Sequence, residues 1–145
     1  MAQEKRHAER ITIKLPVSVL LLDKKTDTVL AGPVPGEARN FSPMGLALSL
    51  DNINIDNYHL FFTCQDNPSH ILRIDFEMPG DPEVAIDVPA KPVWYDRDKE
   101  FREKKRALLG VKFLLKPRDK KIKKLAKELS AAGQAPTSWW KKKIF

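Results

Sequence analysis

Two groups of polar residues in this sequence are of the types that bind phosphates and nucleobases. Arg6 and Arg10 stand four residues apart, and Asn40, Ser42 and Gly45 follow later in a polar turn. The planar guanidinium of arginine bonds phosphate oxygens or a guanine edge through two parallel hydrogen bonds, and it stacks on purine faces. An amide and a hydroxyl add shorter hydrogen bonds, and glycine permits a positive φ or a close backbone approach. These residue types fit a site for an anionic nucleotide.

Composition alone offers a simpler explanation of both groups. Arg6 and Arg10 lie in a polar N-terminal segment and fit a solvated charged tail. An Asn-x-Ser sequence followed by proline and glycine fits an ordinary turn. What separates the two readings is that both groups occur in order and that each leads into a run of alternating apolar residues.

Taken together, the two groups resemble the signature of the PilZ domain family, which is RxxxR followed by (D/N)xSxxG. Family members that keep both halves bind the bacterial second messenger cyclic di-GMP, as a ligand and not as a cofactor. The resemblance implies that the arginines clamp the phosphates and a guanine while the turn holds the other side. Asn40 stands where Asp is commoner, which leaves the affinity open. The implied ligand-binding residues are Arg6, Arg10, Arg39, Asn40, Ser42 and Gly45.

Length and composition predict one ordinary soluble domain. The chain has 145 residues, a single cysteine (Cys64), and no apolar segment typical of a signal peptide or a membrane span. We therefore expect a cytoplasmic protein. The net charge of +7 is unevenly distributed: residues 1–96 carry 9 Lys/Arg against 14 Asp/Glu, and residues 97–145 carry 17 against 5. A basic C-terminal third can attract nucleic acid, anionic lipid or an acidic protein.

Alternating apolar residues predict strands, and one later segment has a helical period. The expected strands are 11–21, 28–31 (broken by the Gly/Pro run 32–36), 46–50, 60–64, 72–78, 84–95 (interrupted by Pro89 and Pro92) and 109–115. Six or seven short strands with turns between them indicate an antiparallel β-barrel, so the fold class is mainly β. An apolar stripe on residues 117–132 predicts a C-terminal helix, with Pro117 at its first position: Ile122, Leu125, Ala126 and Leu129.

The PilZ resemblance covers most of the chain, because Val93-Trp94 and Gly110-Val111-Lys112-Phe113 are similar to the paired last strands of that barrel and a helix follows them. We expect a single PilZ-like domain over residues 1–132. It comprises an N-terminal arm (1–10), a barrel (11–116) and a helix (117–132). Residues 133–145 form a separate basic and aromatic tail.

No pattern in the sequence predicts catalysis. His7, His59 and His70 are scattered without metal-ligand spacing, and Cys64 falls in an apolar run typical of a core. We therefore expect a binding module and not an enzyme.

Three functional hypotheses follow. The leading one is a cyclic di-GMP receptor whose N-terminal arm orders on binding and signals to an unidentified effector protein, with motility, polysaccharide and virulence outputs all open. The alternative is a PilZ-like scaffold that acts through protein or membrane contacts of the basic helix and the Trp139-Trp140-Lys tail, with weak or no nucleotide binding. Folding of that tail back on the barrel is equally compatible with its composition. The third, nucleic-acid binding, is disfavoured by the acidic balance of residues 1–96.

Overall fold

The computed structural model describes residues 15–77, 85–97 and 106–131. Six strands close into an antiparallel barrel in the order β1-β2-β3-β8-β7-β6. They are β1 (Leu15–Asp23), β2 (Thr28–Ser42), β3 (Gly45–Leu50), β6 (His70–Glu77), β7 (Ala85–Arg97) and β8 (Ala107–Phe113). The predicted fold class, a barrel followed by a C-terminal helix, is confirmed.

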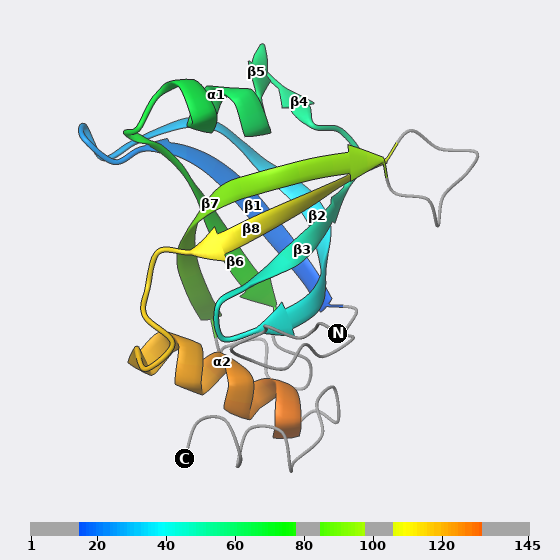
Figure 1. The fold of residues 1–145 in the computed structure, drawn as a ribbon, viewed down its shortest axis with the longest axis vertical. Helices are drawn as coiled ribbons and strands as arrows, with labels where there is room; N and C mark the ends of the chain where they lie inside the picture. The colour runs from blue at the N-terminus through cyan, green and yellow to red at the C-terminus, as the bar shows by residue number, and fades with distance from the viewer. Residues whose placement is uncertain (1–14, 78–84, 98–105, 132–145) are drawn as a thin grey trace, which may run out of the picture.

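The two ends of the barrel are covered differently (Figure 1). At one end lie α1 (Leu60–Asp66) and a small hairpin of β4 (Asn54–Ile55) and β5 (Tyr58–His59), and at the other lies α2 (Lys120–Ala131). The predicted apolar stripe of α2 is confirmed, since its four residues are fully buried in the same core as the inward side chains of the strands. Among the described helices, none is long and apolar enough to cross a membrane.

The segment 60–64, expected as a strand, is helical instead. A short apolar run cannot be assigned to strand or helix by periodicity alone. His59 begins the helix, because its ring Nδ1 accepts a hydrogen bond from the Phe62 N–H at 3.2 Å. Leu60 and Cys64, four residues apart, then face the core together. The Lys91 ammonium donates to the Cys64 carbonyl at 3.1 Å and so ties α1 to β7.

Two strands run through the prolines that were expected to break them. In β2, the register against β1 shifts between Val19 and Leu22, and this bulge accommodates Gly32, whose φ is +99°. In β7, Pro89 and Pro92 both stay paired with neighbouring strands. A proline removes only one ladder donor, and the remaining pairs of a closed barrel keep the strand in place.

Helix α2 starts at Lys120, so the expectation that Pro117 is its first residue is wrong. Asp119 precedes the helix, and its carboxylate accepts from the Lys121 N–H at 2.9 Å while its carbonyl accepts from the Lys123 N–H at 3.0 Å. Both bonds are those of an N-cap residue.

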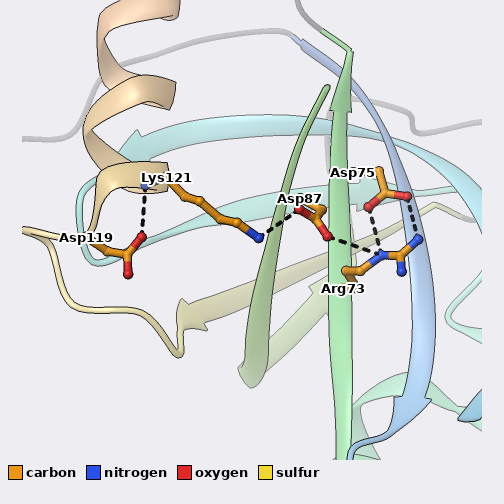
Figure 2. Close-up of polar contacts among 5 residues, drawn as sticks. All are labelled: Arg73, Asp75, Asp87, Asp119 and Lys121. Carbon is orange, nitrogen blue, oxygen red and sulfur yellow. Dashed lines mark hydrogen bonds and ion pairs between the residues drawn. The ribbon is translucent and has the colours of Figure 1, made fainter. Parts of the chain in front are cut away.

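Ion pairs join the start of α2 to the outside of the barrel (Figure 2). The Lys121 ammonium lies 2.9 Å from Asp87 on β7, and Asp87 lies 4.0 Å from Arg73 on β6. Arg73 is in turn held by two hydrogen bonds to Asp75, at 2.9 and 3.1 Å. The hydrogen bond from Lys121 is the main reason why the pKa of Asp87 lies below its usual value.

We predict that α2 is held by its buried stripe and only weakly by this ion pair. Leu125→Ala should lower the free energy of unfolding by about 2–5 kcal/mol, as core truncations do. Asp87→Asn should cost less than about 1 kcal/mol, because both partners are half exposed. Urea unfolding at pH 7 measures both, and a larger loss for Asp87→Asn than for Leu125→Ala would contradict this assignment.

Comparison of wild type with Asp87→Asn also tests how the contribution of this ion pair to stability depends on pH. Since the folded-state pKa of Asp87 is lowered, its stabilising contribution is present above the ordinary carboxyl pKa and is lost as the pH falls through the lowered value. The difference between wild type and Asp87→Asn should therefore vanish in acid.

Candidate functional site

The turn between β2 and β3 is fixed by the hydroxyl of Ser42. Its Oγ accepts a hydrogen bond from the Met44 N–H at 3.2 Å and donates one to the Gly45 carbonyl at 3.4 Å. The side chain is largely buried, and Ser42 and Gly45 pair across the turn. A hydroxyl has one donor and two acceptor positions, so one lone pair of Ser42 is left for a further partner.

Asn40 has a φ of +52°, the left-handed conformation. Asparagine adopts it more easily than most non-glycine residues. Asn40 lies where the register of β2 against β3 shifts, between Arg39 and Ser42. The positive φ of this loop therefore belongs to Asn40.

Gly45 is required by a close approach of two strands. A Cβ atom at Gly45 would lie 2.1 Å from the carbonyl oxygen of Val111 on β8. The Phe113 N–H also donates to the Met44 carbonyl at 2.9 Å, which ties the turn to β8. The sequence suggested either a positive φ or a close backbone approach as the reason for a glycine at this position. The structure supports the close approach.

Beside this turn lies a hollow of about 290 Å³ on the barrel surface. Three residues of β3 and β8 that line it have small side chains or none: Gly45, Ala47 and Gly110. The remaining lining residues are Asn40, Ser42, Met44, Leu46, Val93, Trp94, Val111 and Lys112. Three of the six predicted site residues (Asn40, Ser42 and Gly45) are thus brought together.

The indole of Trp94 lies directly against Gly110. A Cβ at Gly110 would come within 2.1 Å of the indole Cε2 and 2.2 Å of Nε1, and the two residues are cross-strand partners. The same register places Ala47 opposite Gly110 and Arg39 opposite Ala47. Cross-strand partners share a face of the sheet, so one row on the outer face runs from Arg39 over Ala47 and Gly110 to Trp94.

Arg39 is not among the residues that line the hollow. Its side chain is only 8% exposed, and its guanidinium lies 2.9 Å (Nη2) and 3.0 Å (Nε) from one carboxylate oxygen of Glu37. As a predicted phosphate ligand it stands beside the hollow, held by an acidic residue that the sequence did not associate with the site.

Arg6 and Arg10 lie outside the described residues, but the place where their segment joins the barrel is defined. Leu15, the first residue of β1, pairs with Ala38, which is next to Arg39. Arg10 is five residues before Leu15, so its Cα can lie at most about 17 Å away. The strand that follows this segment therefore begins opposite the residue that precedes Arg39.

Sequence reasoning missed Trp94, Lys112 and Met44. The segments with Trp94 and Lys112 were recognised only as strands. An alternation of apolar residues does not predict that the ring of Trp94 will lie against Gly110, 16 residues later. That pairing depends on the register of β7 against β8, which includes a shift between Pro92 and Trp94.

A second hollow of about 310 Å³ adjoins the first. Met44 and Lys112 line both, and the second continues along residues 113–117 toward α2. The surface depression thus extends from the turn to the segment that leads into the C-terminal helix.

The described residues hold no group of three or more metal-ligating side chains. Cys64 is buried in the core, as predicted, and burial raises the pKa of its thiol to about 11. A thiol with such a pKa is not a nucleophile at neutral pH.

Comparisons with known proteins agree with this geometry. The family model of the PilZ domain matches residues 4–131. Among solved structures, the chain is similar to the PilZ domain with c-di-GMP of YcgR from Escherichia coli, with a TM-score of 0.52 and 10% sequence identity. The similarity covers 89% of this chain and 91% of that one. The comparison with curated proteins finds no significant match.

We predict that Gly45→Ala distorts the turn. The added methyl would meet the Val111 carbonyl, so the free energy of unfolding should fall by about 1–3 kcal/mol, as overpacking costs. Met44→Ala, in the same turn at an exposed position, is the matched control and should stay within about 0.5 kcal/mol of wild type. Equal stability of the two variants in denaturant would show that β3 and β8 can separate here at no cost.

Proposed function

Because the chain belongs to the PilZ domain family, we propose that it is a receptor domain for cyclic di-GMP. The observation that carries the proposal is the hollow itself, which is lined by Asn40, Ser42 and Gly45 together with Trp94. The similar solved structure is of a PilZ domain with c-di-GMP, which supports the same ligand class. The proposed activity is binding and not catalysis.

The hollow offers a guanine both a flat surface and hydrogen-bonding groups. Trp94 is 40% exposed, and a base can stack on an indole with about 1–3 kcal/mol of stabilisation. The amide of Asn40 can accept from a guanine N–H or donate to its carbonyl. The exposed ammonium of Lys112 adds a positive charge for a phosphate at the edge of the hollow.

The size of the hollow suggests that it holds only part of the ligand. At about 290 Å³ it is at the lower end of small-molecule sites, which are typically ~300–1,000 Å³. Cyclic di-GMP has two guanines and two phosphates, so other groups must cover the remainder. Arg6 and Arg10, on the segment that precedes β1, are suited to do so, since each guanidinium can bind a phosphate or a guanine edge.

On this proposal the N-terminal segment orders over the ligand and presents a new surface to an effector protein. Such a switch works only through the difference in ligand affinity between the two states. The second hollow leads to the segment before α2, so the basic face of α2 is where the effector would bind. The chain would act in the cytoplasm, where cyclic di-GMP signalling takes place.

The alternative is a scaffold in which nucleotide binding is weak or absent. The exposed face of α2 supports it: five lysines (Lys120, Lys121, Lys123, Lys124 and Lys127) point outward. With the Trp139-Trp140-Lys tail, this face would bind an acidic protein or an anionic membrane surface.

Arg10→Ala tests the role of the N-terminal segment. Calorimetric titration of cyclic di-GMP at physiological salt should show saturable binding to wild type, and the variant should lose at least about 2 kcal/mol, because a charge-assisted contact is gone. Lys25→Ala removes the same charge from the exposed turn between β1 and β2 and should bind like wild type. Unchanged affinity of Arg10→Ala would remove this residue from the site.

Truncation of residues 134–145 makes a stacking test possible, because it removes Trp139 and Trp140 and leaves Trp94 as the single tryptophan. Cyclic di-GMP should then quench its fluorescence, and Trp94→Ala should weaken binding by about 1–3 kcal/mol. Tyr95→Ala is the control: Tyr95 is similarly exposed (42%) but packs on Phe61 and Phe62 of α1.

The same truncation separates the two functions. Retained nucleotide binding with loss of partner or vesicle association would favour the scaffold role for the tail. A wild-type protein that is folded but gives no heat with cyclic di-GMP would exclude the receptor role.

A further inference from the structure

The outer face of β8 carries an aromatic ring, a cation and an apolar side chain in a row. Every second residue of a strand faces the same side, and here Val111 and Phe113 are buried while Lys112 and Leu114 are exposed. The Trp94 indole lies against Gly110, which is on the same face as Lys112. At about 3.4 Å per residue, Lys112 lies roughly 7 Å and Leu114 roughly 14 Å from Gly110 along the chain.

The two adjoining hollows lie along this row. Trp94, Gly110 and Lys112 line the first, and Lys112, Leu114 and Lys116 line the second. Among the described residues, four of the seven exposed large apolar side chains are in these two linings: Met44, Val93, Trp94 and Leu114. Exposed apolar side chains that gather in one place mark a binding surface.

The two lysines of the second hollow are available to an anionic ligand. Both are exposed, and neither forms an ion pair within residues 15–77, 85–97 and 106–131. The cross-strand partner of Lys112 is Gly45 of the turn, which has no side chain to cover it. A phosphate can therefore approach the Lys112 ammonium from the side of the turn.

We propose that the second hollow is the subsite for the second guanine of cyclic di-GMP, so that one extended ligand molecule spans both hollows with a phosphate at Lys112. This inference rests on the proposed function and extends it. The two guanines of the ligand lie on opposite sides of a ring of sugars and phosphates, so the extended molecule has the order base, phosphate, base. The row on β8 matches this order with an indole, an ammonium and a leucine side chain.

The second hollow has the groups that a guanine requires. The apolar side chains of Met44, Leu114 and Pro117 can cover the face of a purine. The Lys116 ammonium can donate to O6 and N7 on the guanine edge. One hollow alone is at the lower end of small-molecule sites, whereas adjoining hollows of about 290 and 310 Å³ together lie well inside the typical range of ~300–1,000 Å³.

Leu114→Ser tests the apolar wall of the second hollow. In calorimetric titration with cyclic di-GMP at physiological salt, this variant should bind roughly three- to tenfold more weakly than wild type, because the purine loses an apolar contact. Val29→Ser is the matched control: Val29 is 52% exposed on β2 and lines neither hollow. Its affinity should stay within about twofold of wild type.

Lys116→Gln tests the cation of the second hollow without changing the first. We expect a loss of roughly three- to tenfold, whereas Lys124→Gln, which removes the same charge from the exposed face of α2, should lose less than about twofold. Equal losses in the two variants would mean that net charge alone acts, and would overturn the proposal. This pair also provides the test if Leu114→Ser does not fold.

The position of each guanine can be observed directly in the wild-type complex. Nuclear Overhauser effects should connect one guanine H8 proton with the Trp94 indole and the other with the Leu114 methyl groups, at one ligand molecule per chain. Wild-type binding without contacts to Leu114, or with two molecules per chain, would overturn this inference and leave the receptor function intact. Absence of binding by folded wild type would overturn both.

Discussion

The close approach of β3 and β8 at Gly45 is the constraint on which the rest of the site depends. A side chain at this position would collide with the Val111 carbonyl, so only glycine lets β3 begin here. The turn before it is then tied to β8 by the hydrogen bond from the Phe113 N–H to the Met44 carbonyl. Gly45 and Val111, the residues of this close approach, both line the hollow.

This constraint explains why a motif associated with ligand binding is also a motif for a backbone shape. The Ser42 hydroxyl donates its hydrogen bond to the Gly45 carbonyl, and Asn40 occupies a left-handed conformation that few residues tolerate. A chain could keep all three turn residues for structural reasons alone. The proposed receptor function would therefore depend more on groups outside the turn, namely Trp94 and the two arginines of the N-terminal segment.

The sequence predicted local features well and the relations between strands poorly. The apolar stripe of α2 and the barrel strands follow from periodicity, since a side chain every second or every third to fourth residue must face the core. The helix at Leu60 and the continuous path of β2 through Gly32 were missed. Their causes are a capping ring at His59 and a bulge in the partner strand. Neither is visible in the apolar pattern of the segment itself.

In the candidate site, too, local features could be predicted from the sequence and relations between strands could not. Asn40, Ser42 and Gly45 were found because they are adjacent in sequence, and they meet in the hollow for the same reason. Trp94 was missed because its place depends on the register of β7 against β8. Arg39 remains a predicted ligand outside the lining of the hollow. Its contact with Glu37 was missed, because side chains two residues apart face the same side only when the segment is a strand. Contacts between strands could be predicted from sequence only after the register is known.

Arg39 and Glu37 form a charged pair next to the turn. An arginine in a nearly buried position must have a counter-charge, because an unpaired buried cation is costly. The Glu37 carboxylate, 2.9 Å from Nη2, provides negative charge beside it. A phosphate that replaced this carboxylate would take over an existing solvation cost without adding a new one. A ligand phosphate that approached Arg39 would therefore meet a guanidinium that is already in contact with an anion.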